Sequence, residues 1–441
     1  MDKLNTKSNA AIVLAFINVI IYELAFVITL IISYDRINYY ANGYALFLVV
    51  YFFFIIIFGR LFGSFGLGST TATDLILSQT LALIFANGMM YCVLCLVAFK
   101  LLNFVPIIVL SLIEFVLSMA LNFYEHRFVR DSYPVEKAIA IVGEKHYKVL
   151  DKIDRYRDII VDVEKRYDES KVNFNKLDKI LNGVDRVITI DIDHEQKKKV
   201  FKACYERKIK VFDIPSITDM LLASSSIMHF IDTPVVRVNK FGPTVFESIA
   251  KRIIDIVGSL TLIILTSPIM LCVALAIKIQ DGGDIFFKQT RLTKDEKEFK
   301  IIKFRSMIMN AEEKTGAVLA KEGDSRITPV GKFIRKTRFD ELPQLINILK
   351  GDMSFVGPRP ERPEIHNEIL KDMPEFKYRL VVKAGLTGYA QIYGKYNTSM
   401  RDKLLLDIYY IENYSLIDDI KLLLMTVKIV FVPESTEGVK E

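Results

Sequence analysis

The sequence predicts a fold in three parts: a membrane α-helical bundle, an α/β domain, and a mainly α domain with a re-entrant membrane helix. Three observations support this prediction. Of the 441 residues, 51% are hydrophobic and yet 25% are charged. The two kinds are segregated, because residues 10–124 are almost free of charge, whereas residues 125–252 and 278–441 hold nearly all of it. In the middle of the chain, short apolar runs alternate with charged helical ones, which is typical of a parallel sheet.

Four apolar runs near the N-terminus are each long enough to cross a hydrocarbon core of about 30 Å. They cover residues 10–33, 44–63, 75–98 and 104–123. None has the polar face that a helix of a soluble core needs. Lys3 precedes the first run and Arg127 follows the last, whereas the opposite loops hold few cations. Because cytoplasmic loops are rich in Lys and Arg, we expect residues 1–125 to form a four-span bundle with both ends in the cytoplasm.

Residues 126–245 change to a pattern of short strands and charged helices. The predicted strands are 138–143, 158–163, 186–191 and 210–214, and the predicted helices are 145–156, 174–183 and 194–207. This alternation predicts a doubly wound parallel sheet, and hence a Rossmann-like cytoplasmic domain. The first strand is followed by Gly143-Glu144, with one glycine where a dinucleotide-binding turn needs three. We therefore expect a structural or regulatory role for this domain and no bound dinucleotide.

The net charge is modest, at +6. A charge of this size is consistent with anionic lipid headgroups or phosphate substrates as partners. It is too small to indicate nucleic acid, and no motif of a nucleic-acid-binding module is present.

A fifth apolar run, residues 253–277, begins the third predicted domain, residues 246–441. Lys251 and Arg252 precede the run, and Lys278 follows it directly. By the distribution of positive charge, both ends of this run are therefore cytoplasmic.

Ser267-Pro268 lies near the middle of the fifth run. Proline removes a backbone hydrogen bond and clashes with the preceding turn. A helix broken there would enter the bilayer, bend and leave on the same face, with the Ser267 hydroxyl meeting part of the freed backbone. We predict such a re-entrant helix over residues 253–279. A full span with a proline kink is the alternative.

Residues 332–362 read KFIRKTRFDELPQLINILKGDMSFVGPRPER and hold the densest group of chemically useful side chains. The carboxylates of Asp340 and Glu341 are adjacent, directly after the cations Arg335, Lys336 and Arg338. Two anions beside three cations suit a site that handles a phosphoryl group and a divalent metal.

Asp340 is predicted to open a helix, with Pro343 in its first turn, where proline is tolerated. The exposed amides and the dipole at a helix N-terminus would hold this carboxylate ionised. An ionised aspartate is a competent nucleophile toward phosphorus. The alternative for Asp340-Glu341 is a helix cap followed by a first-turn acid.

Three further cations are candidates for binding a substrate phosphate. Pro358 and Pro360 bracket Arg359 and fix its backbone, so that its guanidinium would be aimed at an anion. Lys303 and Arg305 end a charged hairpin and either contact phosphate or form a solvated strand edge.

The region from about residue 248 to 433 resembles the bacterial polyprenyl-phosphate glycosyl-1-phosphate transferases, also called initiating sugar transferases. The matching strings are KRIIDIVGSLTLIILTSPI, KIIKFRSM, GKFIRKTRFDELPQLINILKGDMSFVGPRPERP, KAGLTGYAQI and LDIYYIENYSLIDDIKLLL. With the preceding bundle and Rossmann-like domain, the whole chain resembles the large, multi-domain branch of that family.

The resemblance implies transfer of sugar-1-phosphate from a UDP-sugar to undecaprenyl phosphate, which gives undecaprenyl-diphosphate-sugar and UMP. This is the first membrane step of exopolysaccharide or capsule synthesis. It also implies a multi-pass protein of the bacterial inner membrane, with its catalytic domain on the cytoplasmic face. The Ser-Pro break of the family's re-entrant helix corresponds to Ser267-Pro268.

The resemblance also assigns roles to single residues. Asp340 would be the nucleophile that forms a covalent sugar-phosphate intermediate, and Glu341 would hold Mg²⁺. Asp340 and Asp407 are further candidate metal ligands, although Asp407 alternatively supports the fold. Arg335 and Arg359 would contact substrate phosphates, and the P-R-P turn would recognise uridine.

Two other classes of function stay open. One is a catalytically inactive membrane scaffold for polysaccharide assembly, and the other is a membrane phosphohydrolase that uses water as acceptor. The sequence does not identify the sugar, although the ending GPRPERP gives a preference for glucose or galactose. A homodimer is compatible with the resemblance.

Overall fold

The computed structural model describes residues 2–34, 43–67, 70–132, 136–143, 162–174, 176–222, 225–238, 242–309, 324–394 and 398–430. The chain divides into two compact units, Met1–Ser216 and Ile217–Glu441. In its described residues, the first unit contains four long helices and a parallel sheet, and the second is mainly helical.

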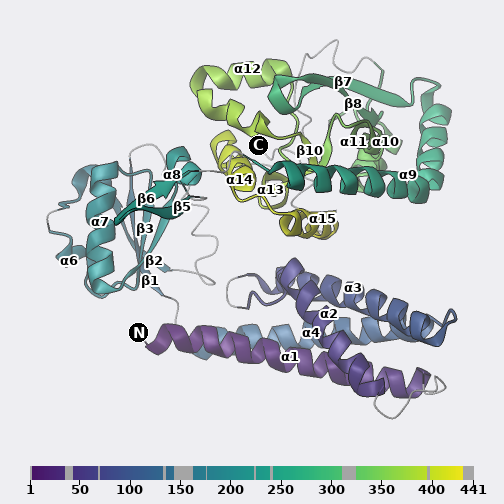
Figure 1. The fold of residues 1–441 in the computed structure, drawn as a ribbon, viewed down its shortest axis with the longest axis horizontal. Coiled ribbons are helices and arrows are strands. Elements are labelled where there is room, and N and C mark those ends of the chain that lie inside the picture. Colours follow the sequence, from purple (N-terminus) through teal and green to yellow (C-terminus); the bar gives the residue numbers. More distant parts are fainter. Residues whose placement is uncertain are drawn as a thin grey trace. The chain divides into compact units, whose positions relative to one another are not determined.

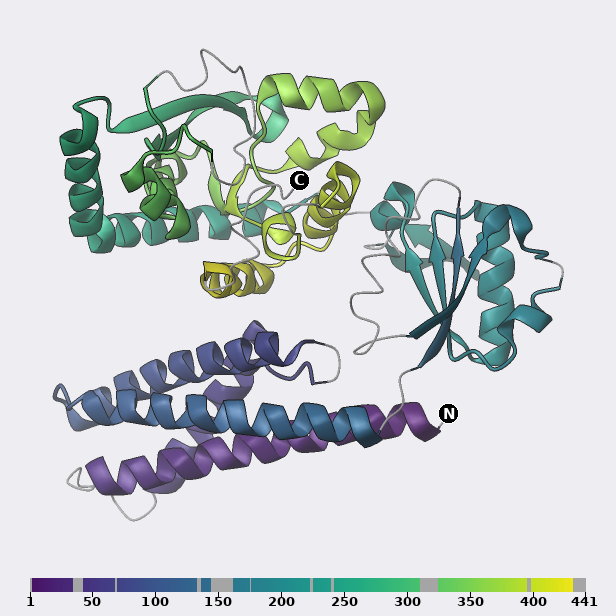
Figure 2. The same ribbon diagram turned by 180° about the vertical axis from the view of Figure 1, so that it is seen from behind.

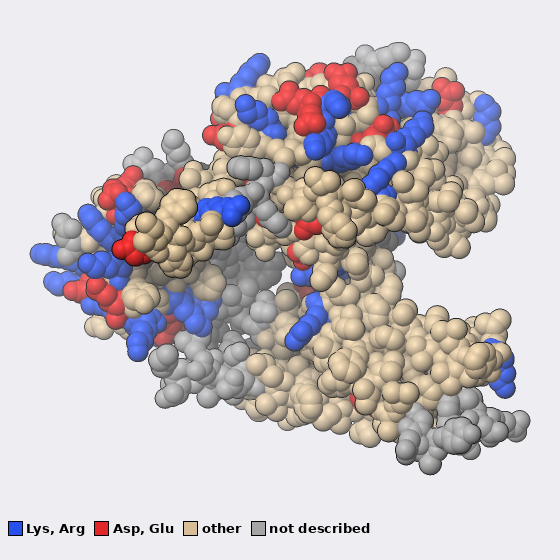
Figure 3. All heavy atoms as spheres, viewed as in Figure 1, with Lys and Arg blue, Asp and Glu red and all other residues tan. Residues whose placement is uncertain are grey.

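Four long apolar helices occupy the first part of the chain, as predicted (Figure 1). They are α1 (Asp2–Tyr34), α2 (Gly43–Phe62), α3 (Ala72–Ala98) and α4 (Val105–Ser132). Figure 3 shows that the visible surface of this bundle is almost free of charged side chains. Among the described residues, five helices are long and apolar enough to cross a membrane, these four and one in the second unit. The chain is therefore a membrane protein.

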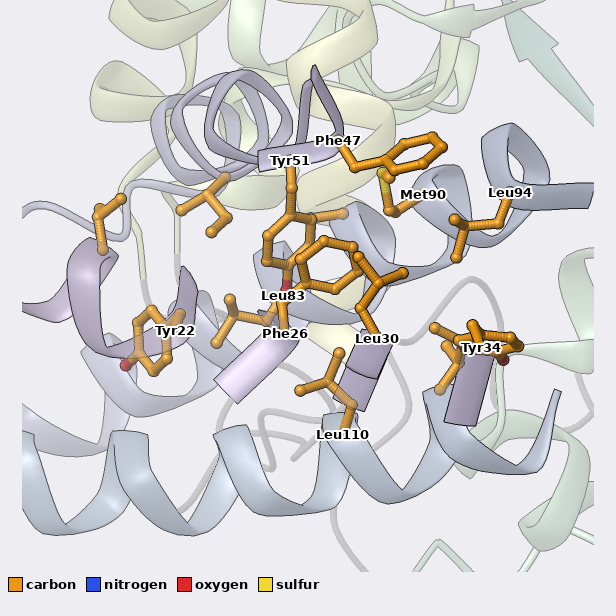
Figure 4. Packing of buried hydrophobic residues seen from close by; sticks show 14 residues of the cluster. Tyr22, Phe26, Leu30, Tyr34, Phe47, Tyr51, Leu83, Met90, Leu94 and Leu110 are labelled. Carbon is orange, nitrogen blue, oxygen red and sulfur yellow. The ribbon is translucent and has the colours of Figure 1, made fainter. Parts of the chain in front are cut away.

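The bundle interior combines apolar packing with buried hydrogen bonds. Phe26 and Tyr51 stack with ring centroids 4.2 Å apart (Figure 4). The Tyr51 hydroxyl lies 2.8 Å from Glu114 Oε1, and Asn87 Nδ2 donates to Glu114 Oε2 at 2.7 Å. In lipid, polar side chains of this kind face the bundle interior and join helices to one another.

The first unit also holds a four-stranded sheet in the order β2-β1-β3-β4, with every neighbouring pair parallel. Its strands are β1 (Lys137–Val142), β2 (Asp162–Asp168), β3 (Arg186–Ile190) and β4 (Lys210–Ile214). The connecting helices are η1 (Glu169–Lys171), α6 (Asp178–Leu181) and α7 (His194–Arg207). Helix α7 covers one face of the sheet, because Val200 and Cys204 pack against Ile139 and Val187 (Figure 2).

Three of the four predicted strands and the helix at 194–207 are confirmed to within a residue. Of the predicted strand 158–163, residues 158–161 lie outside the described residues, and residues 162–163 belong to β2, which continues to Asp168. This strand lies at an edge of the sheet, where charged side chains are tolerated; Lys137 Nζ pairs with Glu164 Oε1 at 2.7 Å. An apolar run is therefore a poor guide to it.

The predicted helix 174–183 is reduced to the single turn α6. Leu177 and Leu181 anchor this turn in the core, and Gly183 has a φ of 73°, which ends it. The predicted helix 145–156 lies outside the described residues.

The second unit is mainly helical with three two-stranded sheets, β5–β6, β7–β8 and β9–β10. Its elements are α8 (Ile217–Leu222), β5 (Ser226–Phe230), β6 (Thr233–Arg237), α9 (Val245–Asp281), β7 (Phe286–Leu292), η2 (Lys294–Glu296), β8 (Glu298–Phe304), α10 (Pro329–Lys336), η3 (Phe339–Glu341), α11 (Gln344–Lys350), β9 (Ser354–Val356), α12 (Pro363–Asp372), η4 (Pro374–Val381), β10 (Gly385–Thr387), α13 (Tyr389–Ile392), α14 (Met400–Glu412) and α15 (Leu416–Val430). Strands β7 and β8 form the charged antiparallel hairpin that the sequence predicts.

Helix α8 belongs to this second unit, although the sequence analysis places it in the middle domain. Its residues Ile217 and Met220 pack against a cluster that contains Phe376, Leu404 and Ile408. The unit therefore starts before the predicted boundary at residue 245.

Helix α9 is one continuous helix of 37 residues that contains Pro268. Figures 1 and 2 show that it bends sharply into two arms. The predicted break is therefore a bend within a helix. Pro268 has no N–H to donate to the carbonyl of Ile264, and the Ser267 hydroxyl donates to that oxygen instead, at 2.8 Å. The Ser267 hydroxyl thus hydrogen-bonds one backbone group that the proline leaves without a partner.

Both arms of α9 pack against the same body of the second unit. In the first arm, Asp255 Oδ1 accepts hydrogen bonds from Ser354 Oγ and the Phe355 N–H, each at 3.0 Å. In the second arm, Val273 and Ile277 lie in a buried cluster with Phe304.

The Asn347 amide connects the hairpin to helix α11. Its Nδ2 donates to the Lys300 carbonyl at 2.9 Å and to Asp352 Oδ2 at 3.2 Å, and its Oδ1 accepts from the Ile302 N–H at 3.0 Å. The side chain is 1% exposed. One buried amide thus fixes the strand that carries Lys303 relative to the helix that follows Asp340.

Asn347→Ala should destabilise the second unit by about 2–4 kcal/mol, because it leaves several buried polar groups without partners. The measurement is the Tm of the detergent-purified protein. Asn413→Ala is the matched control, since the Asn413 amide donates within its own helix to the Tyr409 carbonyl. Equal losses of Tm in the two variants would contradict this role for Asn347.

Candidate active site

Asp340 and Glu341 lie in the 3-10 turn η3, and not at the start of an α-helix. Helix α11 begins only at Gln344, after Pro343. Because Pro343 has no N–H, the carbonyl of Phe339 accepts instead from the Leu342 N–H at 3.2 Å, which closes a tight 3-10 turn. The prediction that Asp340 opens a helix with Pro343 in its first turn is therefore wrong.

The turn is held from both sides by apolar packing. Phe339 and Leu342 contact the buried cluster that contains Phe304 and Ile334. Arg338, just before the turn, adopts a left-handed conformation with φ of 60°. The apolar anchors leave the two carboxyl groups between them facing the cations of neighbouring elements.

Of the two adjacent carboxylates Asp340 and Glu341, named here the dyad, Glu341 is the one that forms ion pairs. Its Oε1 lies 2.7 Å from Lys303 Nζ and 3.4 Å from an Arg359 Nη2. Burial opposes its negative charge, but the Lys303 ammonium and the Arg359 guanidinium outweigh burial and lower the pKa of Glu341. Glu341 is therefore an anion throughout the physiological pH range.

Asp340 is the unpaired member. Its Oδ1 is buried, and no described residue donates a hydrogen bond to it. Burial and the adjacent charge of Glu341 raise the pKa of Asp340 to about 6, although the cations Lys303 and Arg335 act in the opposite direction. Asp340 does not lie at the N-terminus of an α-helix, so the predicted helix dipole does not hold its carboxylate ionised. At neutral pH, the group is a largely ionised carboxylate with one oxygen free to react.

Arg335 lies on α10, half-buried, and makes no ion pair with any described carboxylate. It acts on Asp340 through its charge. A cation that is near a carboxylate without being paired to it is available to an incoming anion.

Pro358, Arg359 and Pro360 follow strand β9 in a loop, named here the P-R-P loop (358–360). Both prolines are buried, whereas the Arg359 side chain is 47% exposed. The structure therefore brings together Asp340, Glu341, Lys303 and Arg359 from three separate segments.

Two predicted site residues lie elsewhere. Arg305 pairs with Asp281 and so connects the end of the hairpin to the end of α9. Asp407, on α14, is 1% exposed and accepts from Arg379 Nε at 2.9 Å. The structure thus favours the predicted alternative in which Asp407 supports the fold.

Within the described residues, no group of three or more His, Cys, Asp or Glu side chains could hold a metal. Mg²⁺, however, is often bound by one or two carboxylates together with substrate phosphates. The unpartnered Oδ1 of Asp340 beside the ionised Glu341 fits such a site.

The sequence analysis missed Arg379, which is 3% exposed and pairs with Asp407. A signal was present, because each residue is a single charge within an apolar stretch, YRLVV and LLLDIYY. Isolated opposite charges in apolar runs are expected to be buried together.

Comparison with known proteins is consistent with this geometry. The profile of the bacterial sugar transferase family matches residues 246–433. The chain is 38% identical over 228 residues to the UDP-N-acetylgalactosamine-undecaprenyl-phosphate N-acetylgalactosaminephosphotransferase of Aeromonas hydrophila, a match covering 51% of this chain and 53% of that protein. It is 36% identical over 241 residues to a UDP-glucose:undecaprenyl-phosphate glucose-1-phosphate transferase of Escherichia coli, covering 53% and 52%.

The chain spans about half the length of these two relatives. A UDP-glucose:undecaprenyl-phosphate glucose-1-phosphate transferase of Caulobacter vibrioides is 39% identical over 190 residues, which make up 42% of this chain and 71% of that protein. This match covers most of a shorter relative, and the family profile covers the segment that carries Asp340 and Glu341. This chain belongs to the bacterial sugar transferase family.

Proposed function

We propose that this protein transfers sugar-1-phosphate from a UDP-sugar to undecaprenyl phosphate, as the first membrane step of exopolysaccharide or capsule synthesis. One observation carries the proposal: a free carboxylate oxygen of Asp340 lies beside Glu341, whose charge is fixed by Lys303 and Arg359. The names of the relatives, which are UDP-sugar and undecaprenyl-phosphate sugar phosphotransferases, support the substrate classes.

In the first step, an Asp340 oxygen attacks the phosphorus that carries the sugar. A bond from aspartate to phosphorus forms, the bond between this phosphorus and the bridging oxygen breaks, and UMP leaves with the electron pair. Burial of Asp340 weakens its hydration, so the carboxylate enters the reaction poorly solvated and more nucleophilic.

In the second step, a phosphate oxygen of undecaprenyl phosphate attacks the same phosphorus. The bond to Asp340 breaks and the carboxylate is regenerated, which gives undecaprenyl-diphosphate-sugar. One diphosphate linkage is replaced by another, so the reaction needs no further energy source. The covalent intermediate lets one site serve a soluble donor and then a lipid acceptor.

Both steps bring anions together, and the cations around the dyad are placed to offset that repulsion. Arg359 is exposed and fixed at its backbone, and Arg335 has no described anionic partner. Asp340 and Glu341 would hold Mg²⁺, which supplies charge neutralisation at the substrate phosphates when bound.

The shape of α9 supports a re-entrant membrane helix. If straight, its 37 residues would extend about 55 Å, more than a bilayer's hydrocarbon thickness. The contacts of Asp255 in one arm and Ile277 in the other arm are with the same body. Both ends of α9 would then lie on one face of the bacterial inner membrane, with the catalytic domain in the cytoplasm.

The exposed apolar side chains of α9, such as Leu260, Ile264 and Leu271, would lie among the lipid tails. The reactive turn would then stand at headgroup depth, where the acceptor phosphate lies. The parallel sheet of the first unit would form a Rossmann-like regulatory domain. A homodimer stays a prediction.

The proposed activity is tested with full-length protein in nanodiscs, Mg²⁺ and a panel of UDP-sugars. UMP release should depend on undecaprenyl phosphate for repeated turnover, and Asp340→Asn should abolish it while membrane insertion is retained. Release of sugar phosphate without the lipid would indicate a phosphohydrolase instead. No release of UMP or sugar phosphate with any donor would indicate a scaffold.

The topology of α9 is tested by placing single cysteines at Ser248 and Asp284, which are exposed at its two ends, in a cysteine-free background. Both should react with a membrane-impermeant maleimide only in inside-out vesicles. A cysteine at Lys100 is the control and should react only in right-side-out vesicles. Labelling of positions 248 and 284 from opposite sides would establish a full span.

Substitutions in the dyad should change stability in opposite directions. The pKa of Asp340 rises from about 3.9 in the unfolded chain to about 6 in the folded protein. The folded state therefore binds the proton more tightly, and stability falls as pH rises between these values, by at most about 3 kcal/mol. Asp340→Asn removes this loss and should raise the Tm at pH 8, with the gain vanishing near pH 4.

Glu341→Gln should instead lower the Tm at pH 8, because the lowered pKa of Glu341 means that its charge stabilises the folded state. That contribution disappears as pH falls through its folded pKa. Tm values of the two variants and the wild type across pH 4–8 provide the measurement. Shifts of equal sign at pH 8 would contradict the assignment of one paired and one unpaired carboxylate.

A further inference from the structure

The P-R-P loop is held by an unusual run of backbone contacts. Four consecutive carbonyls, of residues 358–361, each accept a hydrogen bond from another part of the second unit. The donors are the Gly385 N–H at 2.9 Å, Arg379 Nη2 at 2.9 Å, Arg291 Nη1 at 3.0 Å and the Leu292 N–H at 3.0 Å, in the order of the carbonyls. The loop backbone is therefore fixed at every residue around Arg359.

Two of these four donors are arginine side chains that also share one carboxylate. Arg379 Nη1 lies 3.8 Å from Glu361 Oε1, and Arg291 Nη1 lies 3.9 Å from Glu361 Oε2. Glu361 thus forms an ion pair with each of the two arginines that donate to the loop. Both arginines donate to backbone carbonyls of the loop, so both hold the loop itself.

Arg379 is the more deeply buried of the two. Its side chain is 4% exposed, compared with 19% for Arg291. Its Nε donates to Asp407 Oδ2 and its Nη2 to the Arg359 carbonyl, both at 2.9 Å. Its guanidinium also lies 4.8 Å from the centre of the Phe376 ring. The planar fork of arginine is needed to make two such bonds in fixed directions.

A buried ion pair of this kind costs desolvation energy and adds little stability by comparison with apolar packing. The Arg379–Asp407 ion pair has a second effect, because Arg379 also donates a hydrogen bond to the Arg359 carbonyl and so holds the loop backbone. The backbone of Arg359 is held at its own carbonyl, so that its side-chain torsions alone determine where its guanidinium lies, here 3.4 Å from Glu341 Oε1.

We propose that Arg379, oriented by Asp407, is a positioning residue that sets the place of Arg359 for binding the phosphate and uridine portion of the donor. This inference rests on the proposed function and adds a residue to it. Arg379 touches no reacting atom in this scheme and acts only through Arg359.

The first test variant is Arg379→Lys, which keeps the charge but supplies a single point donor in place of the fork. Its kcat/KM for the UDP-sugar should fall about ten- to hundredfold, chiefly through KM, as expected when a binding group is displaced. A second variant, Arg379→Met with Asp407→Leu, removes the ion pair while filling its volume. It should show the same loss with a Tm close to that of the wild type.

A double-mutant cycle separates positioning from general stability. In an Arg359→Ala background, Arg379→Lys should change kcat/KM by less than about threefold, because the residue through which it acts is gone. Arg326→Gln is the control, since Arg326 is also an arginine in an ion pair, with a side chain that is 14% exposed and lies 2.6 Å from Asp324, and it is remote in sequence from the P-R-P loop. It should leave kcat/KM for the donor near that of the wild type.

Binding of UMP in the presence of Mg²⁺, measured by calorimetry with Asp340→Asn protein, supplies a readout that does not need turnover. Arg379→Lys in that background should weaken UMP binding about tenfold or more. Unchanged UMP affinity and unchanged kcat/KM, or equal losses with and without Arg359, would overturn the positioning role. Absence of UMP binding and of turnover in the wild-type chain would instead overturn the proposed function.

Discussion

The ion pair between Lys303 and Glu341 is the interaction on which the site depends. It joins the β7–β8 hairpin to the η3 turn at 2.7 Å, and it fixes a negative charge next to Asp340. Burial, together with that fixed charge, raises the pKa of Asp340, whose Oδ1 has no hydrogen-bond partner among the described residues. Two adjacent carboxylates thus have different environments, because Lys303 and Arg359 pair with Glu341, whereas Asp340, with a buried Oδ1, forms no ion pair in the described part of the chain.

Much of this was predictable because the determinants are local. Length and apolarity alone identify the five long helices, and the order of charges identifies the dyad. The 3-10 turn was not predictable from periodicity, since it depends on a single missing N–H at Pro343 combined with apolar anchors at Phe339 and Leu342. The raised pKa of Asp340 likewise follows from burial, which arises only when α9, α10 and the hairpin come together.

The contacts that hold the P-R-P loop were not predicted, for a similar reason. Arg291 and Arg379 are distant in sequence, and the single charges of Arg379 and Asp407 in apolar stretches indicate burial without indicating the loop that Arg379 contacts. Only the folded chain shows that the two arginines meet at the P-R-P loop and share Glu361. By contrast, Arg305 resembles Lys303 in sequence, but β8 ends at Phe304 and the chain beyond it turns toward Asp281. Lys303 and Arg305, two residues apart, therefore pair with different carboxylates.

A membrane-inserted helix also explains why polar anchors are so frequent in this unit. The apolar side chains of α9 are largely exposed, at 64% for Ile264 and 67% for Leu265, and in a bilayer they would face lipid. They are then not available to bind α9 to the rest of the unit. In the first arm its polar residues take that role: Lys251 pairs with Asp419, Arg252 donates to the Ile348 and Leu349 carbonyls, and Asp255 accepts from β9. Directional bonds of this kind fix the helix relative to η3 more closely than apolar contact would, as the proposed reaction at a lipid headgroup would require.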